Sequence, residues 1–150
     1  MLKEGDKAPN VTLQTDSGET FRLSDLKGKR VVLYFYPKAD TPGCTTEACE
    51  FRDHMQAFAR AGTAVLGISP DKPAAQAKFK QKYELPFTLL ADEEKAAAKA
   101  YGVWKEKNMY GKKVMGIERT TFVIGPDGKI EKIWGKVKAK GHAEEVLGSL

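Results

Sequence analysis

The sequence predicts an α/β fold in which helices flank a mixed central β-sheet. Two observations carry this prediction: a β-α-β unit in the first half of the chain, and a β-hairpin followed by a helix in the second half. The unit consists of apolar, β-branched runs at residues 30–36 and 64–68, separated by a helical segment at 42–61. A helical crossover between two such strands makes them parallel neighbours.

The second half of the chain supplies the antiparallel part of the predicted sheet. Strand-like runs at residues 120–124 and 130–134 are joined by a Pro-Asp-Gly turn, which is a strong hairpin signal, and residues 142–149 predict a closing helix. This order of elements is that of the thioredoxin fold. Because the chain has no repeat, linker or low-complexity tract, we expect one thioredoxin-like domain over residues 1–150.

Shorter elements complete the predicted fold, each indicated by its turn residues and its apolar pattern. They are, in chain order, strands at 11–13 and 20–23, a helical turn from Ser24 to Gly28, a helix at 73–83, a strand at 87–90 and an alanine-rich helix at 92–101.

The segment 103–117 has no clear periodicity, and we expect it to be a long irregular loop. Apolar side chains on such a loop either mark a partner or substrate surface or fold back onto the body as a satellite cluster. We favour the second arrangement. The side chains concerned are Trp104, Met109, Tyr110 and Met115.

The composition, with 41% hydrophobic and 30% charged residues, is that of a globular protein. No apolar run approaches the roughly 20 residues that a membrane helix needs, and the first residues resemble neither a secretory signal nor a transit peptide. We therefore expect a cytoplasmic location and no membrane partner. The net charge of +5 is spread among acids, so its densest group is interpreted as a solvated strand and turn, not a nucleic-acid surface: Lys129, Lys132, Lys136, Lys138 and Lys140.

Two cysteines, Cys44 and Cys49, decide the functional interpretation. Two are too few for the disulfide framework of a secreted protein of this length, so the pair is reactive, metal-binding or incidental. Cys44 lies where a strand has ended and the predicted helix begins. Unpaired amides and the helix dipole favour an anion at this position, and the thiolate is the nucleophilic form of cysteine.

The predicted helix has one apolar face, formed by Cys44, Ala48, Phe51, Met55 and Phe58 at spacings of four and three. Packing of this face on the sheet puts Cys44 in a pocket and leaves Cys49 outside the apolar stripe. Residues five apart in an intact helix have Cα atoms about 8.6 Å apart, whereas a disulfide needs roughly 4.4–6.8 Å. A disulfide between the two cysteines therefore requires the start of the helix to unwind.

Pro37, Thr41 and Cys44 form the pattern P-x-x-x-T-x-x-C, which resembles the active-site motif of the peroxiredoxins. The stretch around them, residues 34–45, resembles one branch, bacterioferritin comigratory protein or peroxiredoxin Q. In this order the similarity is highly specific and covers nearly the whole chain. The further matches are Val65-Leu66-Gly67-Ile68-Ser69, Asp71-Lys72-Pro73, Phe87-Thr88-Leu89-Leu90, Tyr101-Gly102-Val103-Trp104, Arg119 and Asp127-Gly128-Lys129-Ile130.

The resemblance implies a role for each matching residue. Cys44 corresponds to the peroxidatic cysteine, and Cys49 to the resolving cysteine found in many members of the branch. Thr41 corresponds to the hydroxyl that binds the thiolate and the peroxide, and Pro37 to the residue that shields the pocket from water. Arg119 corresponds to the distant arginine that completes the site, although the sequence alone favours a surface arginine at a strand start.

Glu47 lies one helical turn after Cys44, and two interpretations remain open. Its carboxylate either orients Arg119 through a charge-assisted pair or is a first-turn acid that favours the helix dipole.

The implied activity is that of a thiol-dependent peroxidase for hydrogen peroxide and organic hydroperoxides. Attack by the Cys44 thiolate gives a sulfenic acid, which Cys49 condenses with to form an intramolecular disulfide. An external dithiol then reduces this disulfide, and the resemblance points to thioredoxin. We expect no metal, flavin or haem, no nucleic-acid partner, and a monomer.

Three other interpretations compete with the peroxidase. Cys44, Cys49 and His54 recur at intervals of five, but zinc sites favour closer spacing and four ligands. A thioredoxin-like disulfide oxidoreductase normally has a C-x-x-C motif, which is absent. A binding module without catalysis would use the surface of segment 103–117.

Overall fold

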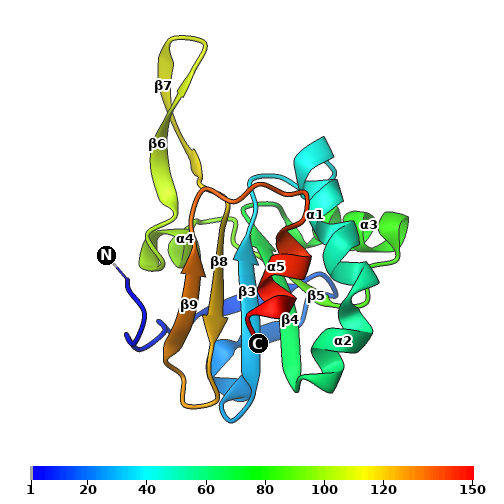
Figure 1. Cartoon of the computed structure of the whole chain (residues 1–150). Coiled ribbons are helices and arrows are strands. Elements are labelled where there is room, and N and C mark those ends of the chain that lie inside the picture. Colours follow the sequence, from blue (N-terminus) through cyan, green and yellow to red (C-terminus); the bar gives the residue numbers. More distant parts are fainter. Residues whose placement is uncertain (1) are drawn as a thin grey trace.

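The computed structural model describes residues 2–150, apart from the side chain of Met109, and Figure 1 shows the arrangement of its elements. Within these residues no helix has the length and apolarity needed to cross a membrane. The elements are β1 (Thr12–Thr15), β2 (Thr20–Arg22), the 3₁₀ helix η1 (Leu23–Leu26), β3 (Arg30–Phe35), α1 (Pro42–Asp53), α2 (Met55–Arg60), β4 (Thr63–Ser69), α3 (Pro73–Tyr83), β5 (Thr88–Ala91), α4 (Ala96–Ala100), β6 (Trp104–Met109), β7 (Lys112–Ile117), β8 (Thr120–Ile124), β9 (Ile130–Trp134) and α5 (His142–Gly148).

The central sheet is mixed, as the sequence predicts, with strand order β2-β1-β5-β4-β3-β8-β9. β3, β4 and β5 run parallel, and α1 and α2 form the crossover between β3 and β4. β8 pairs antiparallel with β3, and β9 with β8, which confirms the predicted hairpin. The β-α-β unit, the hairpin and α5 together give the expected thioredoxin-like fold.

Two apolar layers cover the sheet, one on each face, and β3 contributes to both. Val32 and Tyr34 pack with buried residues of α1, α2, α3 and α5 on one face. Val31 and Leu33 pack with buried residues of η1 and α4 on the other face. A strand enclosed on both faces gains from apolar side chains at every position, which is why β3 shows a continuous apolar run in the sequence. Phe51 fixes α1 to the sheet, with its ring 4.7 Å from that of Tyr34.

The helical segment predicted at 42–61 is divided at His54 into α1 and α2. The backbone N–H of His54 contacts Phe51 O at 3.2 Å, while its ring Nδ1 lies 2.8 Å from Glu50 O. In a continuous helix that carbonyl would accept the His54 backbone N–H. The side chain competes with the backbone for this acceptor, so one continuous helix was the wrong expectation.

The expectation of an irregular loop at 103–117 is also wrong, because β6 and β7 form an antiparallel hairpin that projects from the body (Figure 1). Tyr110 and Gly111 make its turn, both with positive φ, as a two-residue hairpin turn of type I′ requires. Trp104 packs against the core, but Tyr110 is 100% and Met115 is 51% exposed. The predicted satellite cluster is thus limited to Trp104 among the described side chains.

The helix predicted at 92–101 is shorter, with α4 beginning at Ala96. Lys95 has a left-handed backbone, and the Asp92 carboxylate accepts the N–H groups of Ala97 and Ala98 at 3.1 and 2.9 Å. Asp92 therefore satisfies free amides at the helix start from outside the helix, instead of forming its first turn.

Candidate active site

Cys44 is the third residue of α1 and is only 2% exposed. It lies on the apolar face that packs on the sheet, together with Ala48, Phe51 and Phe58, which are fully buried. Met55 is partly buried against the same cluster. The predicted apolar face of the helix is confirmed. The chain folds this way because Pro42 starts the helix with a fixed φ, and the 4-3-4-3 spacing then turns Cys44 toward the sheet.

The loop between β3 and α1 is held by hydrogen bonds with α3 and with the loop between β4 and α3. The Asp40 carboxylate accepts the Lys82 ammonium at 2.9 Å and the Tyr83 hydroxyl at 2.7 Å. The backbone N–H of Ala39 donates to Asp71 at 2.7 Å. These contacts fix the loop that carries the P-x-x-x-T-x-x-C pattern, so the position of Cys44 does not depend on α1 alone.

Sequence reasoning missed a buried polar chain behind this loop. The Tyr36 hydroxyl donates to Gln76 at 2.5 Å, and Gln76 donates to Ser69 Oγ at 2.9 Å. Ser69 in turn donates at 2.7 Å to Asp71, the carboxylate that accepts the loop amide of Ala39. A glutamine inside an alanine- and lysine-rich helix looks like a surface residue in the sequence. The apolar neighbours of Tyr36 at the end of β3 were the available signal for a buried hydroxyl that needs a partner.

Arg119 reaches the site because Phe35, the last residue of β3, pairs with Thr120, the first residue of β8. Its Nη2 lies 3.3 Å from Cys44 Sγ, and its Nη1 lies 2.7 Å from Glu47 Oε1. A Cβ on Gly43 would stand 3.1 Å from Nη2, so the glycine leaves space for the guanidinium. One arginine thus bridges the thiol and a carboxylate on the same helix.

Glu47 is fully buried, and only one of its two oxygens has a partner within the described structure. Burial raises the pKa of Glu47 to about 7, although Arg119 acts in the opposite direction. Of the two interpretations of Glu47, the pairing with Arg119 is the one observed. A buried carboxylate that holds a guanidinium by one oxygen fixes the direction of the second N–H group, which points to the sulfur.

Thr41 and Pro37 both lie in the loop before α1 and are partly buried. The Thr41 hydroxyl donates to Lys38 O at 2.8 Å. With its proton engaged there, Oγ1 has lone pairs free to accept a hydrogen bond from the O–H of a hydroperoxide. The predicted roles of Thr41 toward the sulfur and of Pro37 as a shield remain predictions.

Cys49 lies on the same helix and is half-buried, and both cysteines are free thiols. α1 is continuous from Pro42 to Asp53, so the two residues are held apart by intact helix. The requirement for unwinding before a Cys44–Cys49 bond forms stays a prediction. No group of three or more His, Cys, Asp and Glu side chains in the described part of the chain is arranged to hold a metal ion.

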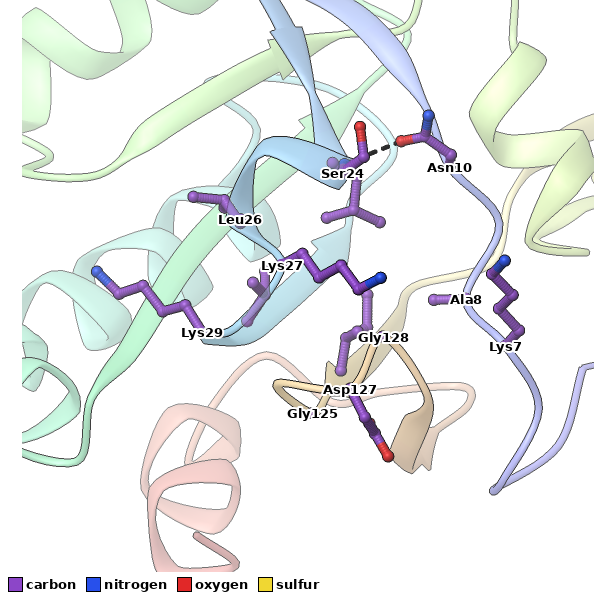
Figure 2. Close-up of a pocket in the computed structure, with 13 residues that line it drawn as sticks. Lys7, Ala8, Asn10, Ser24, Leu26, Lys27, Lys29, Gly125, Asp127 and Gly128 are labelled. Atoms are coloured by element: carbon purple, nitrogen blue, oxygen red, sulfur yellow. Dashed lines mark hydrogen bonds between the residues drawn. The ribbon is translucent and has the colours of Figure 1, made fainter.

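A separate cavity of about 290 Å³ lies at the other end of β3 (Figure 2). Its lining includes Val31 near the start of β3, Ile124 at the end of the antiparallel β8, and the side chains of Lys27 and Asp127. None of the predicted site residues contributes to its lining. The cavity is therefore distinct from the Cys44 site.

A thioredoxin-like fold that places a buried cysteine at a helix start, against a guanidinium held by a buried carboxylate, defines a thiol-dependent oxidoreductase. The guanidinium can stabilise both a thiolate and a polarised peroxide, and the class of thiol peroxidases combines these features.

Comparison with known proteins identifies the family. The model of the AhpC/TSA family matches residues 4–133. The chain is 56% identical to a putative peroxiredoxin Bcp of Coxiella burnetii over 99% of both chains, and 53% identical to peroxiredoxin Bcp of Bacillus subtilis over 99% of this chain and 95% of that protein. This chain belongs to the AhpC/TSA family of peroxiredoxins, in the Bcp or peroxiredoxin Q branch, and is a thiol peroxidase.

Solved structures agree with this assignment. A cysteine mutant of Xylella fastidiosa PrxQ superimposes with a TM-score of 0.94 at 40% identity, covering 99% of this chain and 95% of that one. The bacterioferritin comigratory protein of Xanthomonas campestris, whose structures concern its alkyl peroxide reduction activity, has a TM-score of 0.89 at 42% identity and covers 93% and 88%.

Proposed function

We propose that Cys44 is the peroxidatic residue of this peroxidase and that Cys49 resolves its oxidised form. The observation that carries the proposal is the 3.3 Å contact between Arg119 Nη2 and Cys44 Sγ, made by a guanidinium that Glu47 holds from the other side. This arrangement favours the thiolate and offers positive charge where the reaction develops negative charge.

In the first step the Cys44 thiolate attacks the terminal oxygen of a hydroperoxide. An S–O bond forms as the O–O bond breaks, and two electrons pass from sulfur to the leaving oxygen. That oxygen departs as hydroxide or alkoxide and takes a proton from solvent, and Cys44 becomes a sulfenic acid. The Thr41 Oγ1 accepts the O–H of the substrate, while Pro37 limits access of water to the sulfur.

In the second step Cys49 attacks the sulfur of Cys44, so that an S–S bond forms and water leaves. The helix must unwind at its start for this step, because residues five apart in an intact helix lie beyond disulfide reach. Unwinding also exposes the disulfide to a dithiol reductant, which restores both thiols by two exchange reactions. A thiol reductant is general to peroxiredoxins, and for this chain we assign the role to thioredoxin.

Attack by the thiolate requires an O–O bond and accepts either hydroxide or an alkoxide as the leaving group. The substrates therefore include hydrogen peroxide and organic hydroperoxides. The alkyl peroxide activity of the Xanthomonas campestris relative supports the second class. We further propose that residues 1–150 act as one monomeric domain in the cytoplasm, without metal or organic cofactor and without a nucleic-acid or membrane partner. A single seven-stranded sheet covered on both faces supports the single domain.

The test compares wild-type protein with the Cys49→Ser variant in two assays. The variant should reduce the first equivalent of peroxide at the wild-type rate and accumulate a sulfenic acid on Cys44, detected by a sulfenic-acid-specific probe. It should fail to turn over with thioredoxin and thioredoxin reductase. Sustained thioredoxin-linked turnover by the variant would refute the role of Cys49, and equal turnover of wild type with glutathione alone would refute the choice of thioredoxin.

A further inference from the structure

The cavity at the end of β3 remote from Cys44 has a floor made of the apolar core. Leu23 of η1, Val31 of β3 and Ile124 of β8 line it, and each is at most 8% exposed. Ala8, from the segment before β1, is also buried and belongs to the lining. All four side chains are part of one apolar layer of the sheet. The hollow is therefore framed by packed elements of the fold.

The volume of this cavity, about 290 Å³, is close to the lower end of the range for small-molecule sites. At about 30 Å³ for a water-sized group, it holds on the order of ten non-hydrogen atoms. Water over an apolar floor finds few hydrogen-bond partners, whereas a hydrocarbon of this size removes its own surface and that of the floor from water. The floor therefore fits a ligand with a short apolar body.

The lining of the cavity also carries three positive charges, those of Lys7, Lys27 and Lys29. Among residues 2–150 no carboxylate forms an ion pair with any of the three. In Figure 2 the side chain of Lys27 extends toward Gly128, another lining residue, whereas that of Lys29 points away. Lys27 thus brings an ammonium without an anionic partner to the apolar hollow.

Asp127 is the one carboxylate among the described lining residues, and it is engaged in its own turn. Its Oδ1 accepts the backbone N–H of Lys129 at 3.0 Å and stands 3.1 Å from the position that a Cβ on Gly125 would take. In Figure 2 the carboxylate points away from Lys27. The charge of the lining is therefore positive, and the complementary ligand is an anion.

We propose that this cavity binds a small organic carboxylate, with the hydrocarbon body on the apolar floor and the carboxylate at the Lys27 ammonium. An apolar hollow with a few placed polar groups is the usual form of a small-molecule site, and a lysine ammonium pairs with a carboxylate as a compact charge. The ligand is a free solute of about ten non-hydrogen atoms. The site is separate from the Cys44 site, and binding there does not depend on the proposed function.

The probe is octanoate, whose size matches the cavity, titrated into reduced protein at constant ionic strength and followed by calorimetry and methyl NMR. We expect one molecule per chain with a Kd on the order of 0.1 mM, and shifts of the Val31 and Ile124 methyl signals. Lys27→Gln should weaken binding about fivefold, and Lys27→Arg should restore it. Lys112→Gln, at an exposed position of the β6–β7 hairpin, is the matched control and should bind as wild type does.

A second variant and two further probes separate the apolar body from the charge. Ala8→Leu puts a larger side chain into the cavity, so it should abolish octanoate binding and leave peroxide reduction unchanged. Acetate has the charge without the body and should shift neither methyl signal. Absence of octanoate binding at millimolar concentrations, equal binding of octylamine, or wild-type affinity in both Lys27→Gln and Ala8→Leu would overturn the proposal. Binding to anionic phospholipid vesicles but not to octanoate would assign the lysines to a membrane surface and overturn it as well.

Discussion

Replacement of Glu47 by glutamine tests two effects of the buried carboxylate: its pH-dependent contribution to stability and its hold on Arg119. The side chain is fully buried, and it accepts one hydrogen bond, from Arg119 Nη1 at 2.7 Å. Its second oxygen has no partner in the described structure. Glutamine keeps the size and the acceptor oxygen but carries no charge, so it removes the ionisation and retains the packing.

Burial raises the pKa of Glu47 from 4.5 to about 7. The folded protein therefore holds this proton more tightly than the unfolded chain does. The resulting stability is fully present below pH 4.5 and is lost as the pH rises to about 7. At about 1.36 kcal/mol per pKa unit, the whole effect is on the order of 3 kcal/mol, most of it between about pH 5 and pH 8.

The assay is urea unfolding of the reduced wild type and of Glu47→Gln at both pH values. Relative to wild type, the glutamine variant should gain about 2 to 3 kcal/mol on going from pH 5 to pH 8. Its second-order rate constant for hydrogen peroxide should fall about tenfold, because a neutral amide holds Arg119 less tightly. Glu144→Gln, at an exposed position of α5, is the control and should show neither effect. A pH-independent difference between wild type and Glu47→Gln would refute the reasoning.

Three further changes have definite expected outcomes. Arg119→Lys removes the two-pronged contact and should lower the second-order rate constant about 10²-fold in stopped-flow assays with little change in Tm; a loss below threefold would count against the guanidinium. Phe51→Ala, in the fully buried ring that stacks on Tyr34, should cost about 3–5 kcal/mol in urea unfolding, and a cost below 1 kcal/mol would contradict the packing. Asp92→Ala frees the amides of Ala97 and Ala98 and should cost about 1–2 kcal/mol, with faster hydrogen exchange in α4 as the local readout; unchanged exchange there would exclude the capping role.

The central part of the fold could be predicted because its sequence signals are local and mutually consistent. β3 is a short β-branched and aromatic run, and α1 begins at Pro42 with a stripe of apolar residues on one face. Both elements follow from burial, which dictates side-chain type at each position. The hairpin of β8 and β9 is equally local, because a Pro-Asp-Gly turn joins two strand-like runs.

Other features depend on contacts that the sequence does not display. The β6–β7 hairpin has solvent on much of its surface, so no alternation of apolar residues marks its strands. The break at His54 arises from a ring nitrogen competing for one carbonyl. The series of hydrogen bonds from Tyr36 through Gln76 to Asp71 joins segments that are distant in the sequence. No pattern in any one of these segments reveals it.

The residues of the site also differ in how far the local sequence predicts them. The position of Cys44 at a helix start could be reasoned from the residues near it, and so could its inward direction. Arg119 lies 75 residues away, and only the family resemblance indicated it. The register of β3 with β8 is the physical reason that this arginine reaches the sulfur, and register is set by the packed sheet as a whole.

The most direct test of Cys44 as the reacting group is a single turnover of fully reduced protein with one equivalent of hydrogen peroxide, in parallel with Cys44→Ser, with free thiols counted afterwards. We expect the wild type to consume the peroxide rapidly and lose both thiols while remaining monomeric, and the variant to be inert. Equal, slow consumption by both proteins, with their thiols retained, would contradict the assignment of the peroxidase chemistry to Cys44.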